Sequence, residues 1–176
     1  ELMGGKVGVE SIPGVGSTFW FTSRLLKKEI VNNKPPIAID NSPESTIKNN
    51  FSGSQILIVD DEPINRELVQ MLLEEVGIIV QIATDGQEAL TAIKSSLFAA
   101  VIMDMQMPNM GGIEATQLIR KIPDYENIPI IAMTANAFAD DRKRCLEAGM
   151  NDILVKPFSP EDLFSKLLWW LEYKSK

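Results

Sequence analysis

Five short apolar runs, each followed by a segment of helical periodicity, make up the chain from residue 55 onward. Most positions within each run are apolar, which is typical of strands that are buried on both faces of a sheet. Five strand–helix pairs in succession predict a parallel sheet with helices covering both faces. The predicted strands are 56–60, 78–83, 99–104, 129–134 and 152–156, and the predicted helices are 63–76, 87–95, 113–121, 139–148 and 161–173.

An aspartate ends the third run, where Val101 to Met110 read VIMDMQMPNM. An ionised carboxylate within a buried strand is costly, so Asp104 must either reach water at the end of its strand or lie beside an opposite charge. In parallel sheets of this kind, chemistry gathers at the carboxyl ends of the strands. Asp104 is therefore a candidate functional residue.

Three other predicted strands end in polar side chains, which are Asp60 with the adjacent Asp61, Thr134 and Lys156. If these strands are neighbours, their ends converge with Asp104 on one crevice. Three carboxylates in one place repel one another unless a cation joins them, and oxygen ligands suit Mg²⁺ above other ions. A cation, an ammonium and a hydroxyl together meet the needs of the oxygens of a transferring phosphoryl group.

Each of these positions also has a structural interpretation when it is taken alone. The acidic pair at 60–61 could begin a helix, and Asp104 could be a solvated residue at the start of a turn. Thr134 could cap a helix, and Lys156 could be a surface charge. The four strand ends taken together favour a functional site.

Composition excludes several other classes of function. The net charge of −7 does not indicate a surface for nucleic acid, and the absence of histidine excludes histidine-based catalysis and most zinc sites. Cys145 is the one cysteine and cannot form an internal disulfide, which favours a reducing cytoplasm. No apolar run approaches the length of a membrane span, so no membrane contact is expected of this chain.

The first 54 residues have a different character. Alternating patterns at 7–11 and 17–25 predict two strands joined by a turn, and LMGG at 2–5 predicts a helix end. These strands have no core of their own, so residues 1–26 are expected to be disordered or to pair with another chain. Residues 27–54 are rich in Asn, Ser, Pro and Lys and predict a flexible linker. Because the chain begins at Glu1 without a methionine, we expect it to be a piece of a longer protein.

Four motifs, ILIVDDEPIN, VIMDMQMPNMGG, PIIAMTA and ILVKPF, resemble the receiver domain of two-component response regulators. The resemblance covers about residues 55–170 and implies a receiver domain over 55–174. It implies a doubly wound, flavodoxin-like, five-stranded parallel sheet with the strand order 2-1-3-4-5. It also implies that Asp104 is the phosphoacceptor and that Thr134 and Lys156 bind the phosphoryl oxygens. The neighbouring charges would keep Asp104 ionised as the nucleophile.

The resemblance further implies a metal site. Asp61 and Asp104 would ligate Mg²⁺, with Mn²⁺ as the alternative ion. Asp60 would contribute mainly through water, and Gln106 would contribute its backbone carbonyl. One position departs from the commonest pattern, because Ile153 stands where many receivers carry an aromatic switch residue. Rotation of an aromatic ring therefore cannot be the output signal.

The segment ELMGGKVGVESIPGVGSTFWFTSRL resembles the last part of the ATP-binding domain of sensor histidine kinases. Such a remnant at 1–26, joined by a linker to a receiver, implies a cytoplasmic part of a hybrid histidine kinase, itself either free or anchored in a membrane. The implied partners are the histidine kinase core and a histidine phosphotransfer protein, without nucleic acid. The fragment lacks the kinase motifs, so its own catalysis is expected to be limited to phosphorylation and dephosphorylation of its aspartate.

Two other functions remain open on the sequence. A receiver that is not phosphorylated could act only as a docking module, but such receivers usually lack one of the acidic, threonine or lysine positions, and all of these are present here. A phosphohydrolase of the haloacid dehalogenase type also uses an aspartate at a strand end. That family places a second aspartate two residues later, and here the position holds Gln106, which cannot act as that general acid.

The first helix after the acidic pair carries an apolar stripe that is predicted to face the sheet, formed by Leu68, Val69, Leu72 and Val76. Ile64 and Met71 lie off this stripe, next to the acidic residues of the same helix. Single exposed apolar residues are normal in proteins. Two on one face beside the expected site nevertheless favour a docking surface for a helical phosphotransfer partner.

Overall fold

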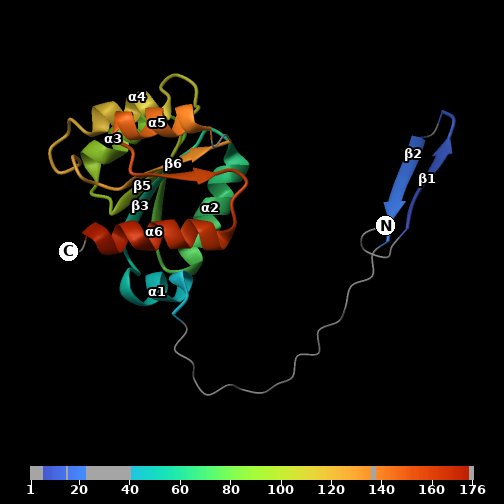
Figure 1. Ribbon diagram of the computed structural model, residues 1–176, viewed down its shortest axis with the longest axis horizontal. Helices are drawn as coiled ribbons and strands as arrows, with labels where there is room; N and C mark the ends of the chain where they lie inside the picture. Colours follow the sequence, from blue (N-terminus) through green and yellow to red (C-terminus); the bar gives the residue numbers. More distant parts are fainter. Residues whose placement is uncertain (1–5, 15, 23–40, 136–137, 175–176) are drawn as a thin grey trace, which may run out of the picture. The chain divides into compact units, whose positions relative to one another are not determined.

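The computed structural model describes residues 6–14, 16–22, 41–135 and 138–174 of the chain. The chain divides into two compact units, Glu1–Ala38 and Ile39–Lys176. The smaller unit contains an antiparallel hairpin, and the larger unit contains a parallel sheet with its helices (Figure 1). Among the described residues, no helix is long and apolar enough to cross a bilayer.

A five-stranded parallel sheet forms the centre of the larger unit. Its strands are β3 (Gln55–Val59), β4 (Ile79–Ala83), β5 (Ala100–Asp104), β6 (Ile130–Thr134) and β7 (Asp152–Val155). They lie in the order β4-β3-β5-β6-β7, which confirms the order expected for a doubly wound sheet. Every residue of β5 and β6 is buried, as the continuous apolar runs predict.

Helices cover both faces of this sheet, as predicted. They are α2 (Pro63–Glu75), α3 (Gly86–Ser95), α4 (Gly112–Ile119), α5 (Ala139–Ala148) and α6 (Pro160–Lys174). One apolar core lies between the sheet and α3, α4 and α5, and the other lies between the sheet and α2 and α6 (Figure 1). The buried carboxyl ends of β3, β5 and β6 therefore fix where the loops that follow them begin.

The face of α2 that packs on the sheet differs in part from the prediction. Val69, Leu73 and Val76 are fully buried, and Leu72 is partly buried. Leu68 is 44% exposed, so its assignment to the buried stripe was wrong. The buried residues follow the spacing i, i+4, i+7, and Leu68 precedes the first of them by one residue, about 100° around the helix.

A further helix, α1 (Pro43–Asn50), lies within the segment that was predicted to be a flexible linker. The side chain of Ser42 caps this helix by accepting a hydrogen bond from the Ser45 backbone N–H, at 3.2 Å. Ile47 is completely buried and belongs to the same core as α6. Residues 43–50 are thus part of the folded unit, and residues 27–40 lie outside the described part of the chain.

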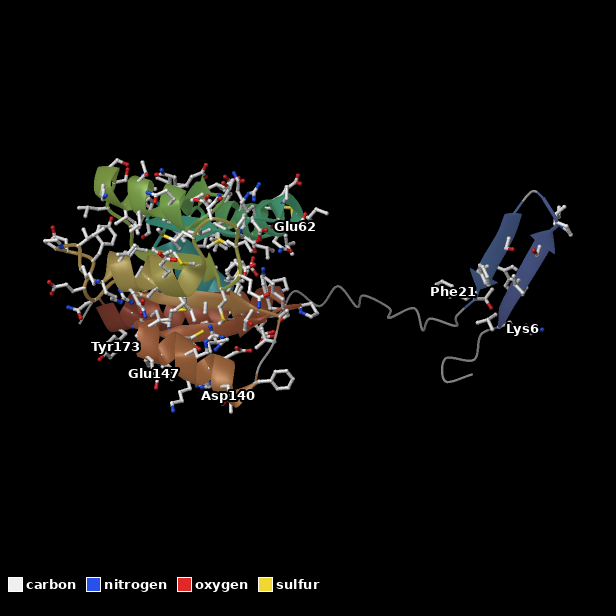
Figure 2. The ribbon with its side chains drawn as sticks, turned by 90° about the horizontal axis from the view of Figure 1, so that it is seen from above. Lys6, Phe21, Glu62, Asp140, Glu147 and Tyr173 are labelled. Atoms are coloured by element: carbon white, nitrogen blue, oxygen red, sulfur yellow. The ribbon has the colours of Figure 1, made fainter. Side chains whose placement is uncertain are left out.

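The hairpin of the smaller unit consists of β1 (Val7–Ile12) and β2 (Gly16–Phe21), which confirms the two strands expected there. Figure 2 shows its side chains, with Lys6 and Phe21 labelled at the open end. Val7, Val9, Phe19 and Phe21 share one face of the hairpin, and each is more than half exposed. The helix end predicted at 2–5 lies outside the described residues.

Candidate functional site

The carboxyl ends of the central strands bring three carboxylates together. Asp60 follows β3, Asp61 is the next residue, and Asp104 is the last residue of β5. One carboxylate oxygen from each of the three lies within 4.8 Å of the others. Asp60 is completely buried and Asp104 is 8% exposed, whereas Asp61 is exposed to solvent.

Lys156, directly after β7, joins two of these carboxylates. Its Nζ lies 2.5 Å from Asp104 Oδ2 and 2.6 Å from Asp60 Oδ2. Its backbone N–H donates to the carbonyl oxygen of Thr134, at 2.7 Å, which ties the end of β7 to the end of β6. Only 19% of the Lys156 side chain is exposed, so this lysine is not a surface charge.

Thr134 and Gln106 also lie close to Asp104. Met133 pairs with Asp104 in the sheet, so Thr134 is the next residue along the adjacent strand. Thr134 and Gln106 both line a hollow of about 270 Å³ between the β5–α4 connection and α5. The backbone N–H of Gln106 donates to Asp104 Oδ1 at 3.1 Å. The three aspartates and Lys156 thus meet at one place, and Gln106 and Thr134 adjoin Asp104 through a backbone hydrogen bond and through the neighbouring strand.

The close approach of α4 depends on Gly112, its first residue. A Cβ at this position would lie 2.1 Å from the carbonyl oxygen of Asp104, so only glycine permits this packing. The preceding loop is anchored by Asp85, whose carboxylate accepts hydrogen bonds from the Glu88 backbone N–H and from Asn109 Nδ2, at 2.9 and 2.8 Å. These two hydrogen bonds lower the pKa of Asp85. The loop that carries Gln106 is thus held from both sides.

The electrostatics of Asp104 differ in one respect from the expectation. Burial raises its pKa above the ordinary value for aspartate, and the hydrogen bonds from Lys156 and from the Gln106 N–H act in the opposite direction without cancelling this effect. For Lys156, burial acts to lower the pKa, but the hydrogen bonds to Asp104 and Asp60 outweigh it and raise the pKa. The protein alone therefore does not fully compensate the charge of Asp104.

The donor set fits a hard divalent cation. Three carboxylates and one ammonium leave two negative charges at the crevice, which one divalent ion would balance. The available ligand atoms are oxygens, and the exposed position of Asp61 leaves room for water, which Mg²⁺ retains in protein sites. The residues present therefore match Mg²⁺ in charge and in ligand type.

Sequence analysis missed two residues that hold Asp60 in place. Asn65 Nδ2 lies 3.2 and 3.3 Å from the two carboxylate oxygens of Asp60, and Arg66 Nη1 donates to its carbonyl oxygen at 2.6 Å. Both residues follow Pro63 in the first turns of α2, where polar side chains point back toward the preceding strand end. The stretch DDEPINR could have revealed these two residues. The helix was already expected to begin at Pro63, so Asn65 and Arg66 could have been placed in its first turns, close to Asp60.

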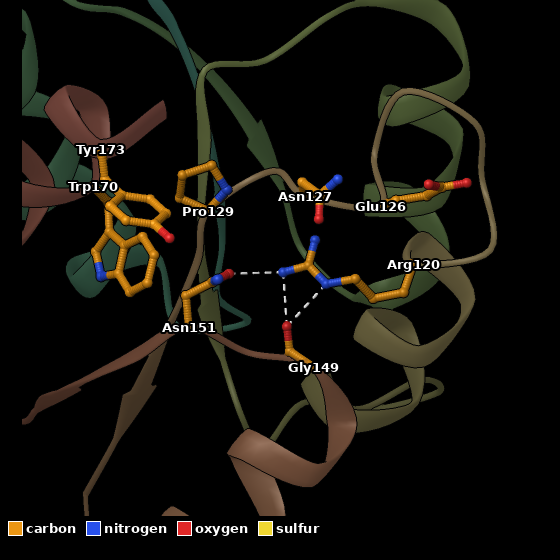
Figure 3. Close-up of a pocket in the computed structure, with 8 residues that line it drawn as sticks. All are labelled: Arg120, Glu126, Asn127, Pro129, Gly149, Asn151, Trp170 and Tyr173. Atoms are coloured by element: carbon orange, nitrogen blue, oxygen red, sulfur yellow. Dashed lines mark hydrogen bonds between the residues drawn. The ribbon is translucent and has the colours of Figure 1, made fainter. Parts of the chain in front are cut away.

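A hollow of about 590 Å³ lies at the opposite end of the sheet (Figure 3). Part of its polar lining is hydrogen-bonded within the protein. Arg120 donates to the carbonyl oxygen of Gly149 from Nε and Nη2, at 2.9 and 2.7 Å, and to Asn151 Oδ1 at 2.7 Å. Trp170 and Tyr173 form the wall beside Asn151. This hollow contains none of the six singled-out residues.

Comparison with known proteins gives one family. The model of the response regulator receiver domain matches residues 56–168. The sensor histidine kinase AruS of Pseudomonas aeruginosa is 36% identical over 165 residues, which are 93% of this chain and 15% of that kinase. The chain thus spans about a seventh of the length of this relative.

Solved structures of receiver domains share the fold. The receiver domain of sensor histidine kinase PA1611 from Pseudomonas aeruginosa, with a magnesium ion coordinated in its active site cleft, is 38% identical with a TM-score of 0.65. The similarity covers 69% of this chain and 99% of that chain. The Saccharomyces cerevisiae complex of the histidine phosphotransfer protein Ypd1 with the receiver domain of Ssk1 matches at 29% identity and a TM-score of 0.66, over 71% of this chain and 93% of that chain.

Proposed function

Because the chain belongs to the response regulator receiver family, we propose that Asp104 accepts a phosphoryl group from a phosphohistidine and passes it to a histidine phosphotransfer protein. The observation that carries this proposal is the position of Lys156, whose ammonium joins Asp104 to Asp60 at 2.5 and 2.6 Å. An acceptor carboxylate, a cation beside it and two further carboxylates for a metal ion are the groups that phosphoryl transfer requires.

In the proposed reaction a carboxylate oxygen of Asp104 attacks the phosphorus atom. The new P–O bond forms as the P–N bond to the donor histidine breaks, and the imidazole keeps the electron pair and takes a proton from solvent. Lys156 and Thr134 bind the phosphoryl oxygens, and the Gln106 N–H orients the attacking carboxylate.

Mg²⁺, with Mn²⁺ as the alternative, would be held by Asp61, Asp104, the backbone carbonyl of Gln106 and, through water, Asp60. When bound, it would supply positive charge to the acceptor and to the phosphoryl oxygens. The raised pKa of Asp104 gives a reason for this requirement, because a nucleophilic carboxylate must be ionised and the protein alone does not fully favour that form.

The parent protein is proposed to be a hybrid histidine kinase that works in the cytoplasm. The similarity to AruS extends over 93% of the chain and so includes residues ahead of the receiver. Residues 1–26 would be the end of the ATP-binding domain, followed by the linker and by the receiver at 55–174. The exposed apolar face of the hairpin supports this assignment, since such a face is normally covered within a larger domain.

The phosphotransfer partner is proposed to dock on the outer face of α2. Ile64, Leu68 and Met71 are 72%, 44% and 57% exposed on this helix. Leu68 also lines a hollow of about 280 Å³ together with Lys156, which places this face next to the acceptor site. Glu67, Glu74 and Glu75 surround Met71 in a second hollow, so a partner with basic side chains around an apolar centre would fit best.

The proposed reaction is tested by incubating the chain with acetyl phosphate, with and without Mg²⁺, and mapping the modified residue by mass spectrometry. We expect one phosphoryl group on Asp104 that appears only with the metal ion. A phosphoryl group on another residue, or none under either condition, would contradict the assignment and favour a receiver that acts only in docking.

The docking surface is tested with the double variant Ile64→Ser, Met71→Ser. It should slow relay from a phosphorylated histidine phosphotransfer protein by about tenfold or more while leaving the reaction with acetyl phosphate unchanged. The matched control is Leu97→Ser, since Leu97 is 71% exposed and follows α3 on the other side of the sheet. Equal loss with both donors would mean that the two side chains support the fold and not the partner.

A further inference from the structure

The carboxylate of Asp60 is held by three donors although no part of the residue is exposed. Oδ1 accepts from the backbone N–H of Glu62 at 2.9 Å, and Oδ2 accepts from Lys156 Nζ at 2.6 Å. The third donor is the side-chain amide of Asn65, which reaches both oxygens at 3.2 and 3.3 Å. A buried carboxylate needs such donors, because each unsatisfied lone pair there is costly.

The amide of Asn65 differs from the other two donors in its geometry. It faces the two oxygens almost equally, so rotation of the carboxylate about its Cβ–Cγ bond would lengthen one of the two contacts. The Glu62 N–H holds Oδ1 and Lys156 holds Oδ2, so each of them contacts one oxygen, whereas the Asn65 amide bridges the two. Asn65 therefore contributes to fixing the plane of the Asp60 carboxylate.

The amide is also neutral, which matters at a crevice where a cation must bind. A lysine or arginine at position 65 would neutralise one of the two excess negative charges and weaken the attraction for a divalent ion. A neutral donor stabilises the buried carboxylate and leaves this charge available. Asn65 therefore donates a hydrogen bond to Asp60 without changing the net charge of the crevice.

We propose that Asn65 is a positioning residue of the acceptor site. It holds Asp60 so that Oδ2 keeps Lys156 in place, and Lys156 in turn reaches Asp104. It also keeps the Asp60 carboxylate directed at the shared space of the three aspartates. The proposal rests on the phosphoacceptor function and adds to it a residue that acts through Asp60.

A purely structural role for Asn65 predicts a different outcome. Arg66 holds the main chain of Asp60 independently, at 2.6 Å from its carbonyl oxygen, and Pro63 begins the helix in either case. Removing the amide should therefore release the carboxylate of Asp60 without displacing the strand end or α2. If Asn65 served only the start of the helix, its loss would lower stability and leave metal binding unchanged.

The test uses Asn65→Ala and Asn65→Leu, with Gln70→Ala as the matched control. Asn65→Leu keeps a similar volume without a donor, and Gln70 bonds Glu74 on the same helix at 2.7 Å. Titration calorimetry with Mg²⁺ alone should show about three- to tenfold weaker binding for both Asn65 variants, the loss that one hydrogen bond predicts, and no change for Gln70→Ala. At saturating Mg²⁺, phosphorylation by acetyl phosphate should show a lower kcat with an unchanged KM.

Mg²⁺ affinities of both Asn65 variants within twofold of the unsubstituted chain, together with a lower unfolding temperature, would overturn the proposal. Loss of affinity in Asn65→Ala but not in Asn65→Leu would overturn it too, since volume and not the donor would then be responsible. The metal titration requires no phosphorylation, so failure of the unsubstituted chain to become phosphorylated at Asp104 would count against the proposed function alone.

Discussion

At the carboxyl ends of the strands, three carboxylates and one ammonium lie close together, whereas near the amino ends Asp152 and Arg120 each have partners of their own. Asp152, at the start of β7, accepts hydrogen bonds from Lys166 Nζ at 2.8 Å and from Trp170 Nε1 at 3.3 Å. Arg120 donates to the carbonyl oxygens of Gly149 and Tyr125. Charge is concentrated and incompletely compensated at one end, and it is dispersed and bonded at the other.

This difference separates function from stability within one sheet. Burial raises the pKa of Asp104, so its ionised form costs free energy until a cation arrives. At Asp152, burial acts to raise the pKa, but the bonds from Lys166 and the Ile153 N–H outweigh it and lower the pKa. An ionised aspartate thus destabilises the folded protein at position 104 and stabilises it at position 152. Substitutions at the two ends should accordingly have opposite consequences.

The largest contrast is expected between Asp104→Asn and Asp152→Asn. Asp104→Asn should lower the rate of phosphorylation by acetyl phosphate on the order of 100-fold or more, because an amide cannot form the acyl phosphate. Asp152→Asn should leave the phosphorylation rate unchanged, since this residue lies at the other end of β7. Rates from phosphoprotein gels or mass spectrometry, with circular dichroism to confirm the fold, test the pair. A comparable loss of phosphorylation rate in both variants would contradict the assignment of the reaction to the carboxyl ends of the strands.

The two partly buried lysine contacts, Lys156 and Lys166, provide the next contrast. Lys156→Ala should slow phosphorylation by about 100-fold, since it removes the charge that faces the phosphoryl oxygens. Lys166→Ala breaks a bridge whose two side chains are 33% and 23% exposed, and it should cost about 1 kcal/mol of stability or less without changing the rate. A Lys156→Ala rate equal to that of the unsubstituted chain would mean that Lys156 only balances Asp60.

Arg120→Met should lower stability without affecting the reaction. It removes hydrogen bonds to two backbone carbonyls and to Asn151, and it leaves these acceptors partly unsatisfied, which costs about 2–4 kcal/mol. Urea unfolding measures this loss. The control is Arg144→Met, whose side chain is 66% exposed beside Asp141 and should change stability little. Equal losses in both variants would show that the network around Gly149 contributes nothing specific.

The smallest effect concerns pH in the absence of metal. Because the folded pKa of Asp104 is raised, its contribution to stability is present below the unfolded pKa and is lost as pH rises through the folded value. Asp152 has a lowered pKa, so its contribution is present above the unfolded pKa and is lost as pH falls through the folded value.

At about pH 7 with a chelator, Asp104→Asn should therefore raise the unfolding temperature and Asp152→Asn should lower it. Each change should be about 2–4 °C per kcal/mol of stability. The change in Asp104→Asn should diminish as the pH falls toward about 4, because the folded pKa of Asp104 is raised. The change in Asp152→Asn should persist to about pH 4 and diminish only below it, because the folded pKa of Asp152 is lowered. Thermal unfolding followed by circular dichroism measures both variants. A change of the same sign at both positions would contradict the difference between the two ends.

Much of the larger unit followed from sequence pattern alone. The five apolar runs gave the strands, and their terminal residues gave Asp60, Asp104 and Lys156, because the carboxyl ends of parallel strands meet at one edge. Helix α1 did not follow, since its stability depends on burying a single residue, Ile47, against distant elements and not on its own polar sequence.

Other features depend on contacts that are distant in the sequence. Arg120 is not singled out by any sequence pattern, and its bond to Gly149, 29 residues away, is set by the fold. Leu68 was placed on the buried face of α2 because adjacent helical positions cannot be separated without knowing how the helix is rotated on the sheet. The side chain of Asn65 reaches Asp60 because of the direction in which α2 leaves the strand end, and the sequence does not give this direction.

The central claim, that the carboxyl end of the sheet holds the metal and the amino end does not, is tested most directly by titrating Mg²⁺ calorimetrically into the unsubstituted chain, Asp61→Ala and Asp152→Asn. We expect one site in the unsubstituted chain, at least about tenfold weaker binding in Asp61→Ala, and unchanged binding in Asp152→Asn. Unchanged binding in Asp61→Ala, or an equal loss in Asp152→Asn, would contradict the assignment of the metal site to the three strand-end aspartates.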